Sequence, residues 1–158
     1  MVLDTTLLVY ALVEEHTVTA TSRALLELMR DGEVRATTTV EVIQEFCHVR
    51  TRRRSRADAP GRARAFARGL TPLVRPDETE LLQGLQLYRA SSALSPFDAV
   101  LAATALGRGW ALASADQAFA AGQGPVAASR KMGAWSTGDQ GETIGSCSAC
   151  AAPSRRTS

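Results

Sequence analysis

The sequence predicts an α/β fold in which a central parallel sheet lies between two layers of helices, a three-layer α/β/α arrangement. Short apolar segments of strand-like composition alternate along the chain with longer segments of helical periodicity. Each helical segment is long enough to carry the chain from one strand to a parallel neighbour. Apolar residues make up 45% of the 158 positions, which suffices for one hydrophobic core. We therefore expect one domain over residues 1–128, followed by a flexible tail at 129–158 that is rich in Gly, Ser and Ala.

The first part of the chain predicts one buried strand and two helices. The apolar run 2–3 has the character of a strand and ends at Asp4. Residues 7–13 are apolar on nearly every side, which is typical of a helix packed against a sheet. Residues 17–31 repeat apolar side chains at helical spacing, and Gly32 is a common type of helix stop.

The middle of the chain continues the alternation. Residues 35–38 lie in a stretch rich in β-branched side chains and predict a second strand. Thr38 and Glu41 have the spacing of a capping box, which predicts a helix from there to about residue 54. The elements that follow are a helix from Asp58 to about Gly69, a strand at Leu73-Val74, and a helix to about Ser91 that Asp77 and Glu80 open with another capping box.

Residues 94–119 carry the last helix and strand on which the site prediction depends. Ser95 and Asp98 have capping-box spacing, so a helix is expected to begin there. Small side chains fill this helix and allow it to approach the sheet closely. The helix is expected to end at Gly107–Gly109 and to be followed by a strand at Trp110–Ser114. A final edge strand is expected at Pro125-Val126.

Composition and charge exclude some classes of protein and favour others. No run approaches the roughly 20 apolar residues of a membrane span, and the N-terminus lacks the basic start of a secretory signal, so we expect a cytoplasmic protein. Residues 50–68 contain eight arginines and one acid, a charge of +7. Because the whole chain has a net charge of +2, the remainder carries −5. This concentration of charge predicts an anion-binding surface, although a solvated face of two helices would have the same composition.

Three aspartates are predicted to meet at one rim of the sheet. Asp4 and Asp116 each follow a predicted strand, and ligands of open parallel sheets collect beyond the carboxyl ends of the strands. Asp98 lies in the first turn of a helix that starts at the same rim. Taken singly, each of these residues could equally be a helix or turn cap.

A fourth acid is expected from the helix over residues 38–54. Its apolar stripe places Glu45 roughly 90° from the stripe centre and Glu41 roughly 130° away, at about 100° per residue. Glu41 also has a predicted role in the capping box. We therefore select Glu45, at the edge of the core, although a lone glutamate on a helix is more often a surface residue.

Carboxylates that converge either take up protons or bind a cation. Their hard oxygen atoms favour Mg²⁺ or Mn²⁺, and such an ion can activate water and stabilise the oxygen that leaves a phosphodiester. The arginine segment would hold the phosphates of the polymer. A set of acidic residues that could bind a metal ion, next to a basic segment that could bind phosphates, indicates a nuclease.

Four segments of this sequence resemble the acidic motifs of PIN-domain ribonucleases, and most closely those of VapC-type toxins of type II toxin–antitoxin systems. The segments, in the order and spacing of that family, read VLDTTLLVYAL, TTVEVIQEFCHV, LSPFDAVLAATAL and LASADQAF. The resemblance covers residues 1 to about 128. It implies a Mg²⁺-dependent endoribonuclease, with Mn²⁺ as a possible substitute, that cleaves a tRNA or rRNA.

The resemblance also implies roles for individual residues and for partners. The catalytic acids would be Asp4, Glu45, Asp98 and Asp116, of which Asp4, Asp98 and Asp116 are expected as metal ligands. Thr5 and Ser114 match the family's hydroxyl positions that orient the acids. The expected RNA contacts are Arg50, Arg52, Arg53, Arg54 and Arg56. A VapB-like antitoxin would cover the groove, and the chain would form a homodimer.

Two other functions are compatible with parts of the pattern. A non-catalytic RNA-binding module could use the segment Arg50–Arg68 alone, and it would bind RNA in a salt-dependent way without cleaving it. A haloacid-dehalogenase-like phosphatase also has an aspartate after its first strand, but the second aspartate expected two residues later is replaced here by Thr6. A zinc site at Cys147 and Cys150 would need further ligands, because one CxxC pair is insufficient.

Overall fold

A small parallel sheet lies at the centre of the protein, as seen in a computed structural model that describes residues 1–14 and 16–121. Strand β1 (Val2–Leu3) pairs in parallel with β2 (Leu112–Ala113), with Val2 opposite Leu112. Two isolated parallel bridges, Val2–Thr37 and Thr39–Val74, continue the pairing on the other side of β1. Segments that are far apart in the sequence therefore meet in one sheet.

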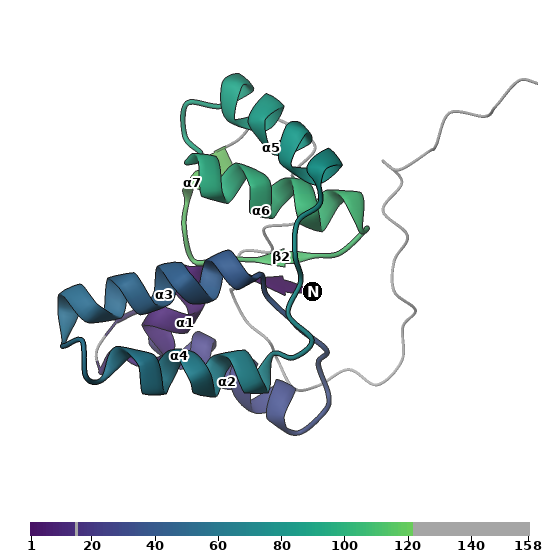
Figure 1. Ribbon diagram of the computed structural model, residues 1–158. Coiled ribbons are helices and arrows are strands. Elements are labelled where there is room, and N and C mark those ends of the chain that lie inside the picture. The colour runs from purple at the N-terminus through teal and green to yellow at the C-terminus, as the bar shows by residue number, and fades with distance from the viewer. Residues whose placement is uncertain (15, 122–158) are drawn as a thin grey trace, which may run out of the picture.

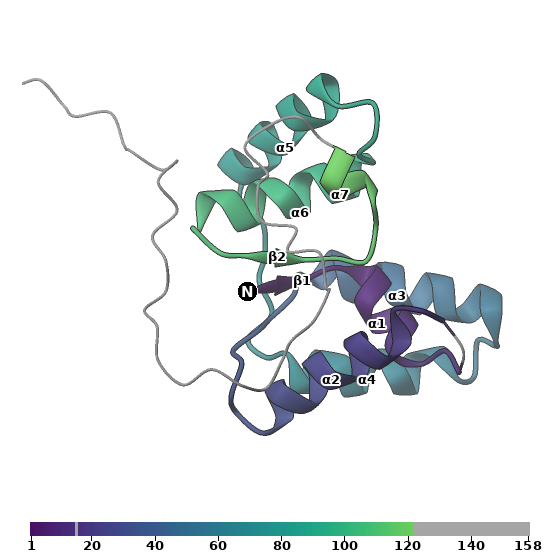
Figure 2. The ribbon, with the colours of Figure 1, turned by 180° about the vertical axis from the view of Figure 1, so that it is seen from behind.

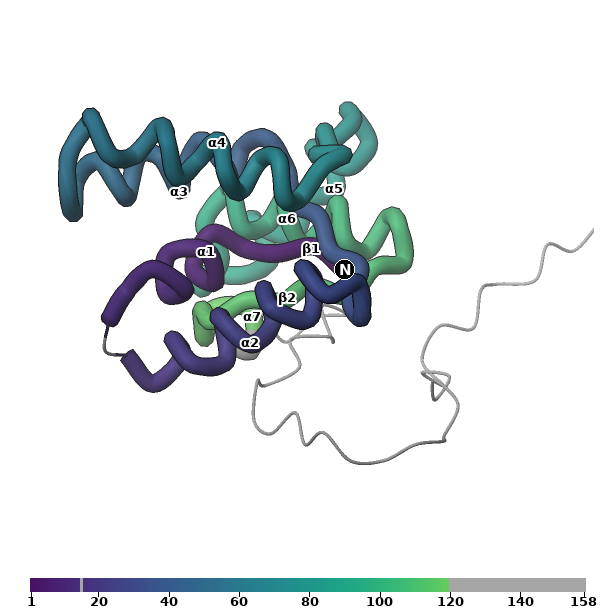
Figure 3. The backbone as a smooth tube through the Cα atoms, turned by 90° about the horizontal axis from the view of Figure 1, so that it is seen from below, coloured from purple at the N-terminus to yellow at the C-terminus, as the bar shows by residue number. Residues whose placement is uncertain are grey.

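Seven helices surround these strands in the described part of the chain. They are α1 (Thr5–Ala11), α2 (Thr19–Arg30), α3 (Val40–Arg53), α4 (Ala59–Gly69), α5 (Glu78–Ala90), α6 (Pro96–Gly107) and α7 (Ala118–Ala121). Helices α1 to α4 lie on one side of the strands and α5 to α7 on the other, in both of the views in Figures 1 and 2. Within each group the helices pack in pairs: α1 contacts α2 and α3, α3 contacts α4, and α5 contacts α6. Figure 3 shows α3 and α4 running side by side.

The predicted α/β class and the parallel pairing of strands are confirmed. The strands expected at 35–38 and 73–74 are reduced to the isolated bridges, because only one or two residues of each make ladder contacts. Helices greatly outweigh strands, so the three-layer description remains a prediction. Within the described ranges, no helix combines the length and apolar content needed to cross a membrane.

Some predictions lie outside the described residues. They are the edge strand at Pro125-Val126, the domain boundary at 128, the tail at 129–158 and the cysteine pair Cys147 and Cys150.

The predicted capping box at the start of α3 is wrong. The helix begins one residue later, and its cap is Thr39, whose hydroxyl accepts a hydrogen bond from the Val42 N–H at 3.3 Å. Thr38 is fully buried, and its hydroxyl donates instead to the Leu3 carbonyl of β1 at 2.6 Å. A tertiary contact with the sheet therefore replaces the local one. Glu41 is free of the capping role that had been assigned to it.

The other two capping boxes are confirmed. Asp77 and Glu80 exchange side-chain and backbone hydrogen bonds at the start of α5, as Ser95 and Asp98 do at the start of α6. Glu80 is buried, and it also pairs with Arg108 at 2.7 Å, which lowers the pKa of its carboxyl group. These local bonds fix where both helices begin.

Helices α5 and α6 approach each other unusually closely at Gly84. A Cβ atom on Gly84 would lie 2.7 Å from the Cα atom of Val100 on α6, closer than real contacts of this kind. Helix α6 also carries small buried residues such as Ala99, Ala102 and Ala103. The absence of a side chain at position 84 therefore sets the spacing of this helix pair.

We expect Gly84→Ala to lower the free energy of unfolding by about 1–3 kcal/mol, because the added methyl group must push α5 away from the α6 backbone. Gly61→Ala is the matched control. It also lies in a helix, but its Cβ would meet nothing within 4 Å, so we expect no loss and a gain of up to about 1 kcal/mol from helix propensity. Urea denaturation of both variants measures the difference, and equal stabilities would contradict the close contact.

Candidate active site

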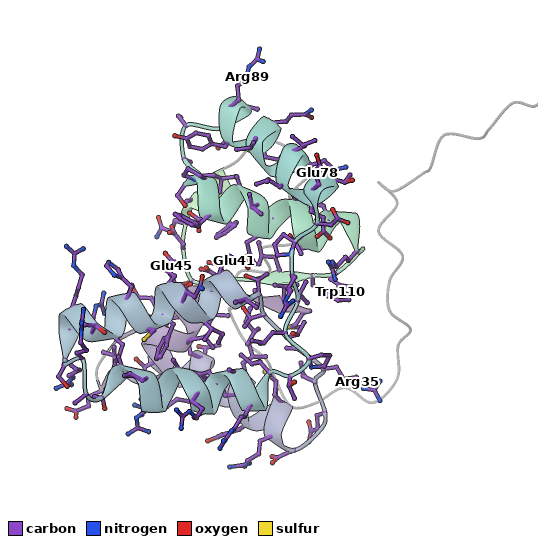
Figure 4. The ribbon with its side chains drawn as sticks, viewed as in Figure 1. Arg35, Glu41, Glu45, Glu78, Arg89 and Trp110 are labelled. Carbon is purple, nitrogen blue, oxygen red and sulfur yellow. The ribbon has the colours of Figure 1, made fainter. Side chains whose placement is uncertain are left out.

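A pocket of about 400 Å³ opens where the end of β1 meets helices α3, α5 and α6. Six acidic residues line it: Asp4, Glu41, Glu45, Asp77, Glu78 and Asp98. Figure 4 shows Glu41 and Glu45 on α3 and Glu78 on α5. The rest of the lining is largely apolar and includes the exposed side chains of Leu81, Leu85 and Phe97. The pocket therefore combines concentrated negative charge with an apolar wall.

Asp4 lies deepest in this site. It is the N-cap of α1 and only 3% exposed. One carboxylate oxygen accepts the Thr5 N–H at 2.6 Å, and the other accepts the hydroxyls of Thr6 and Ser114, both at 2.6 Å. Burial raises the pKa of Asp4 above its ordinary value, the two hydroxyls oppose this rise, and the negative charge of Asp98 adds to it. The group is held rigidly in a setting that favours a neutralising partner.

Glu45 is connected to Asp4 through the next residue in the chain. The Thr5 hydroxyl donates to Glu45 Oε2 at 2.6 Å, while the Thr5 N–H donates to Asp4. Thr5 and Ser114, the two predicted hydroxyls, thus each contact one of the predicted acids. Glu45 is exposed rather than at the core edge. Glu41 lines the same pocket, so the helical-angle argument that separated the two glutamates does not hold.

Asp98 serves as part of a helix cap and as a pocket residue at the same time. Its Oδ2 atom accepts the Ser95 N–H at 3.2 Å, which completes the capping box of α6. The side chain is half-buried, lines the pocket and is near enough to affect the pKa of Asp4. The capping and functional interpretations of this residue are therefore compatible.

Asp116 is placed differently from the other three predicted acids. Its backbone N–H donates to Ser114 Oγ at 2.9 Å, which links it to the Asp4 network. Its carboxylate is exposed, accepts the Ala118 N–H at 2.8 Å and is not among the described residues that line the pocket. The structure brings Asp4, Glu45 and Asp98 to one pocket and leaves the carboxylate of Asp116 outside it.

Thr6 is a positioning residue that the sequence analysis missed. Its hydroxyl donates to Asp4 and accepts the Ala115 N–H at 3.1 Å, so it joins the start of α1 to the loop after β2. Ser114 makes the parallel connection from Asp4 to the Asp116 N–H. The available sequence signal was the pair of threonines directly after Asp4, of which only the first was interpreted as an orienting group.

The donor chemistry of the pocket suits a hard divalent cation. Carboxylate oxygens are the ligands that Mg²⁺ and Mn²⁺ prefer, and Mg²⁺ retains several waters, so few protein ligands suffice. Among residues 1–14 and 16–121, however, no group of three acids lies close enough to hold an ion as the side chains stand. Glu45 and Asp98 each keep one carboxylate oxygen without a hydrogen bond to a described residue. These residues therefore suit a divalent cation, because they supply carboxylate oxygens and because they line one pocket.

The arginine segment lies at the far end of α3 from these acids. Arg52, Arg53, Arg54 and Arg56 are exposed, and Arg52 lies seven residues, or roughly 10 Å, along the helix from Glu45. Arg50 differs from them because it is half-buried and donates to Asp58 at 2.5 Å, which lowers the pKa of that carboxyl group. One helix thus carries acids at its start and cations at its end.

Comparisons with known proteins agree on the family. A model of the family described as PIN domain matches residues 1–124. Ribonuclease VapC7 of Mycobacterium tuberculosis is 46% identical over 122 residues, which cover 76% of this chain and 84% of that protein. Residues 1–124, which the family model matches, contain all four predicted acids.

We expect Thr6→Val to lower the free energy of unfolding by about 1–3 kcal/mol, because the isosteric side chain leaves the buried Asp4 carboxylate and the Ala115 N–H each without one hydrogen bond. The control is Thr79→Val on α5, where the threonine is exposed and a change within about 0.5 kcal/mol is expected. Thermal and urea unfolding compare the two. A Thr6→Val protein as stable as the control would show that the Thr6 hydroxyl does not support Asp4.

Proposed function

Because this chain belongs to the PIN-domain family, and within it to the VapC-type toxin ribonucleases, we propose that it is a Mg²⁺-dependent endoribonuclease that cleaves a tRNA or rRNA. Mn²⁺ would serve as an alternative ion. The observation that carries this proposal is the shared pocket of Asp4, Glu45 and Asp98, since these acids come from three separate segments of the chain.

The acids have separate tasks in this proposal. Asp4 and Asp98 would hold the ion, and Glu45 would complete the negative pocket. Asp116 would join them only after its exposed carboxylate turns away from the Ala118 N–H and toward the pocket. A bound divalent cation supplies a Lewis acid for the phosphate and a water of lowered pKa. Thr5, Thr6 and Ser114 keep the carboxylates oriented through their hydrogen bonds.

The proposed reaction is hydrolysis of a phosphodiester bond. Water attacks phosphorus, the bond from phosphorus to the 3′ oxygen breaks, and the products are a 5′-phosphate and a 3′-hydroxyl. The exposed arginines at the end of α3 would bind phosphates of the RNA beyond the cleaved bond.

A protein partner is part of the same proposal. The side chains of Leu81, Leu85 and Phe97 are 45%, 47% and 66% exposed beside the acids. Apolar surface of this kind at an active site favours coverage by another protein. We propose a VapB-like antitoxin as that partner, a homodimeric toxin, and action in the cytoplasm where RNA and antitoxin are present.

We expect Asp98→Asn to reduce RNA cleavage by at least about 100-fold, because it removes a negative charge from the pocket that would hold the ion. Asparagine retains an oxygen that can accept the Ser95 N–H, so the α6 cap and the fold should persist. The matched control is Glu27→Gln, which neutralises an exposed acid on α2. The measurement is cleavage of a mixed RNA substrate with Mg²⁺, with Mn²⁺ and with EDTA, together with mapping of the new 5′ ends.

Two outcomes would contradict the proposal. Cleavage that is unchanged in Asp98→Asn would remove the role of the acids. Salt-sensitive RNA binding without cleavage in either metal would support the alternative, a non-catalytic binding module that uses Arg50–Arg68.

A further inference from the structure

A second and larger hollow, of about 1050 Å³, lies at the opposite end of the sheet from the acids. Its lining includes Met1 before β1, Thr37 and Val74 from the bridged segments, and Trp110 before β2. The acidic pocket begins at Asp4, three residues or roughly 10 Å further along the first strand. The two cavities therefore open at the two ends of the same short strands.

The charge of this hollow is opposite to that of the acidic pocket. Arg35, Arg75 and Arg108 line it, and none of its described lining residues is acidic. Arg35 and Arg75 are exposed. Arg108 is paired with Glu80 and donates to the Arg75 carbonyl, so its charge is compensated and its position is fixed. Arg35 and Arg75 are thus the residues available to an anionic ligand.

Trp110 presents an aromatic surface in the same hollow. Its side chain is 40% exposed. The backbone at this point is rigid, because Gly109 adopts a φ of 65° and the chain closes α6 with two hydrogen bonds, Trp110 N–H to Ala105 O and Gly109 N–H to Leu106 O. The guanidinium of Arg108 lies 5.5 Å from the ring centroid. The backbone that carries this large exposed ring is therefore fixed, which limits the entropy lost when a flat group binds on the ring.

We propose that this hollow binds a single-stranded segment of RNA, with a base stacked on Trp110 and phosphates at Arg35 and Arg75. An aromatic platform beside cations that track a phosphate backbone is the combination that binds single strands without sequence preference. Figure 4 shows Arg35 and Trp110 on the same side of the molecule. The inference rests on the proposed function, because it assigns the second contact to the RNA that the acidic pocket cleaves.

This contact has a consequence for substrate length. An RNA that reaches both ends of the sheet binds at two points of one molecule, and the second contact forms at high effective concentration. Long or looped RNA is therefore favoured over short fragments, and the products of cleavage leave more readily than the substrate.

The test uses the full chain with Asp98→Asn, in EDTA, so that neither cleavage nor metal contributes. Anisotropy of a labelled oligouridylate measures affinity at several salt concentrations. We expect Trp110→Ala to weaken binding about tenfold or more with little change in the salt slope. Arg35→Ala and Arg75→Ala should weaken binding and should each reduce the salt slope by about 0.7.

Matched controls remove the same groups elsewhere on the surface. Arg89→Ala removes an exposed arginine at the end of α5, and Tyr88→Ala removes an aromatic side chain that is 46% exposed. Neither lines the hollow, and neither should alter binding. Trp110→Phe retains a smaller stacking surface and should restore part of the affinity. It also keeps the test valid if Trp110→Ala fails to fold.

Tryptophan fluorescence gives a second measurement, which detects RNA binding at the Trp110 ring directly. The chain has two tryptophans, so in a Trp135→Phe background the fluorescence comes from Trp110 alone. We expect the oligouridylate to quench it at concentrations where uridine monophosphate has no effect. Equal quenching by the mononucleotide would overturn the proposal in favour of a small-ligand site. A change of oligomeric state in Trp110→Ala without a change in RNA affinity would overturn it in favour of a second copy of the chain.

Failure of this inference is distinguishable from failure of the proposed function. If the native chain cleaves RNA but the variants of the hollow bind oligouridylate normally, the hollow is not an RNA site and the nuclease assignment stands. If the native chain does not cleave RNA but its binding depends on Trp110 and Arg75, the hollow is supported and the nuclease assignment fails.

Discussion

The buried carboxylate of Asp4 is the group on which the rest of the site depends. Its two oxygens accept hydrogen bonds from Thr5, Thr6 and Ser114, so one side chain ties β1, the start of α1 and the end of β2 together. Removing a carboxylate from water is costly, and the hydroxyls offset only part of that cost. The fold thus holds a charged group where a partner of opposite charge would be bound strongly. In the proposed enzyme, binding of a divalent cation would offset the remaining cost of burying this carboxylate.

The second requirement is the close packing of α5 against α6. Gly84 lets α5 approach the backbone of α6 at Val100, and the capping box of Ser95 orients the first turn of α6. Asp98 is therefore positioned by a cap and by the packing of its helix. The acidic residues at the start of α5 reach the same pocket because Asp77 and Glu80 fix the start of that helix. Helix termini, rather than long strands, build this site.

The parts of the fold that local chemistry decides were predictable from the sequence. The caps at Asp77 and Ser95 could be recognised because both partners of each box lie within one turn. Thr38 could not, because the Leu3 carbonyl that takes its hydroxyl lies 35 residues away in the chain. Residues 35–38 have the composition of a strand, but they form only an isolated bridge with β1. The length of a strand depends on the segments that pair with it, and these are distant in the sequence.

The same limit applies to the site. Asp4, Glu45 and Asp98 were found as candidates from spacing and resemblance. The role of Thr6 depends on an N–H more than a hundred residues later. The pocket that Glu41 lines has walls from α5 and α6, which the periodicity of α3 alone does not predict. The polarity of α3 also has a consequence for the helix itself. Its cations occupy the end where the peptide dipoles are negative, and its first-turn glutamate occupies the positive end. The arginines that we propose as RNA contacts thus also stabilise the end of their own helix, and losing them would fray α3 backwards toward Glu45.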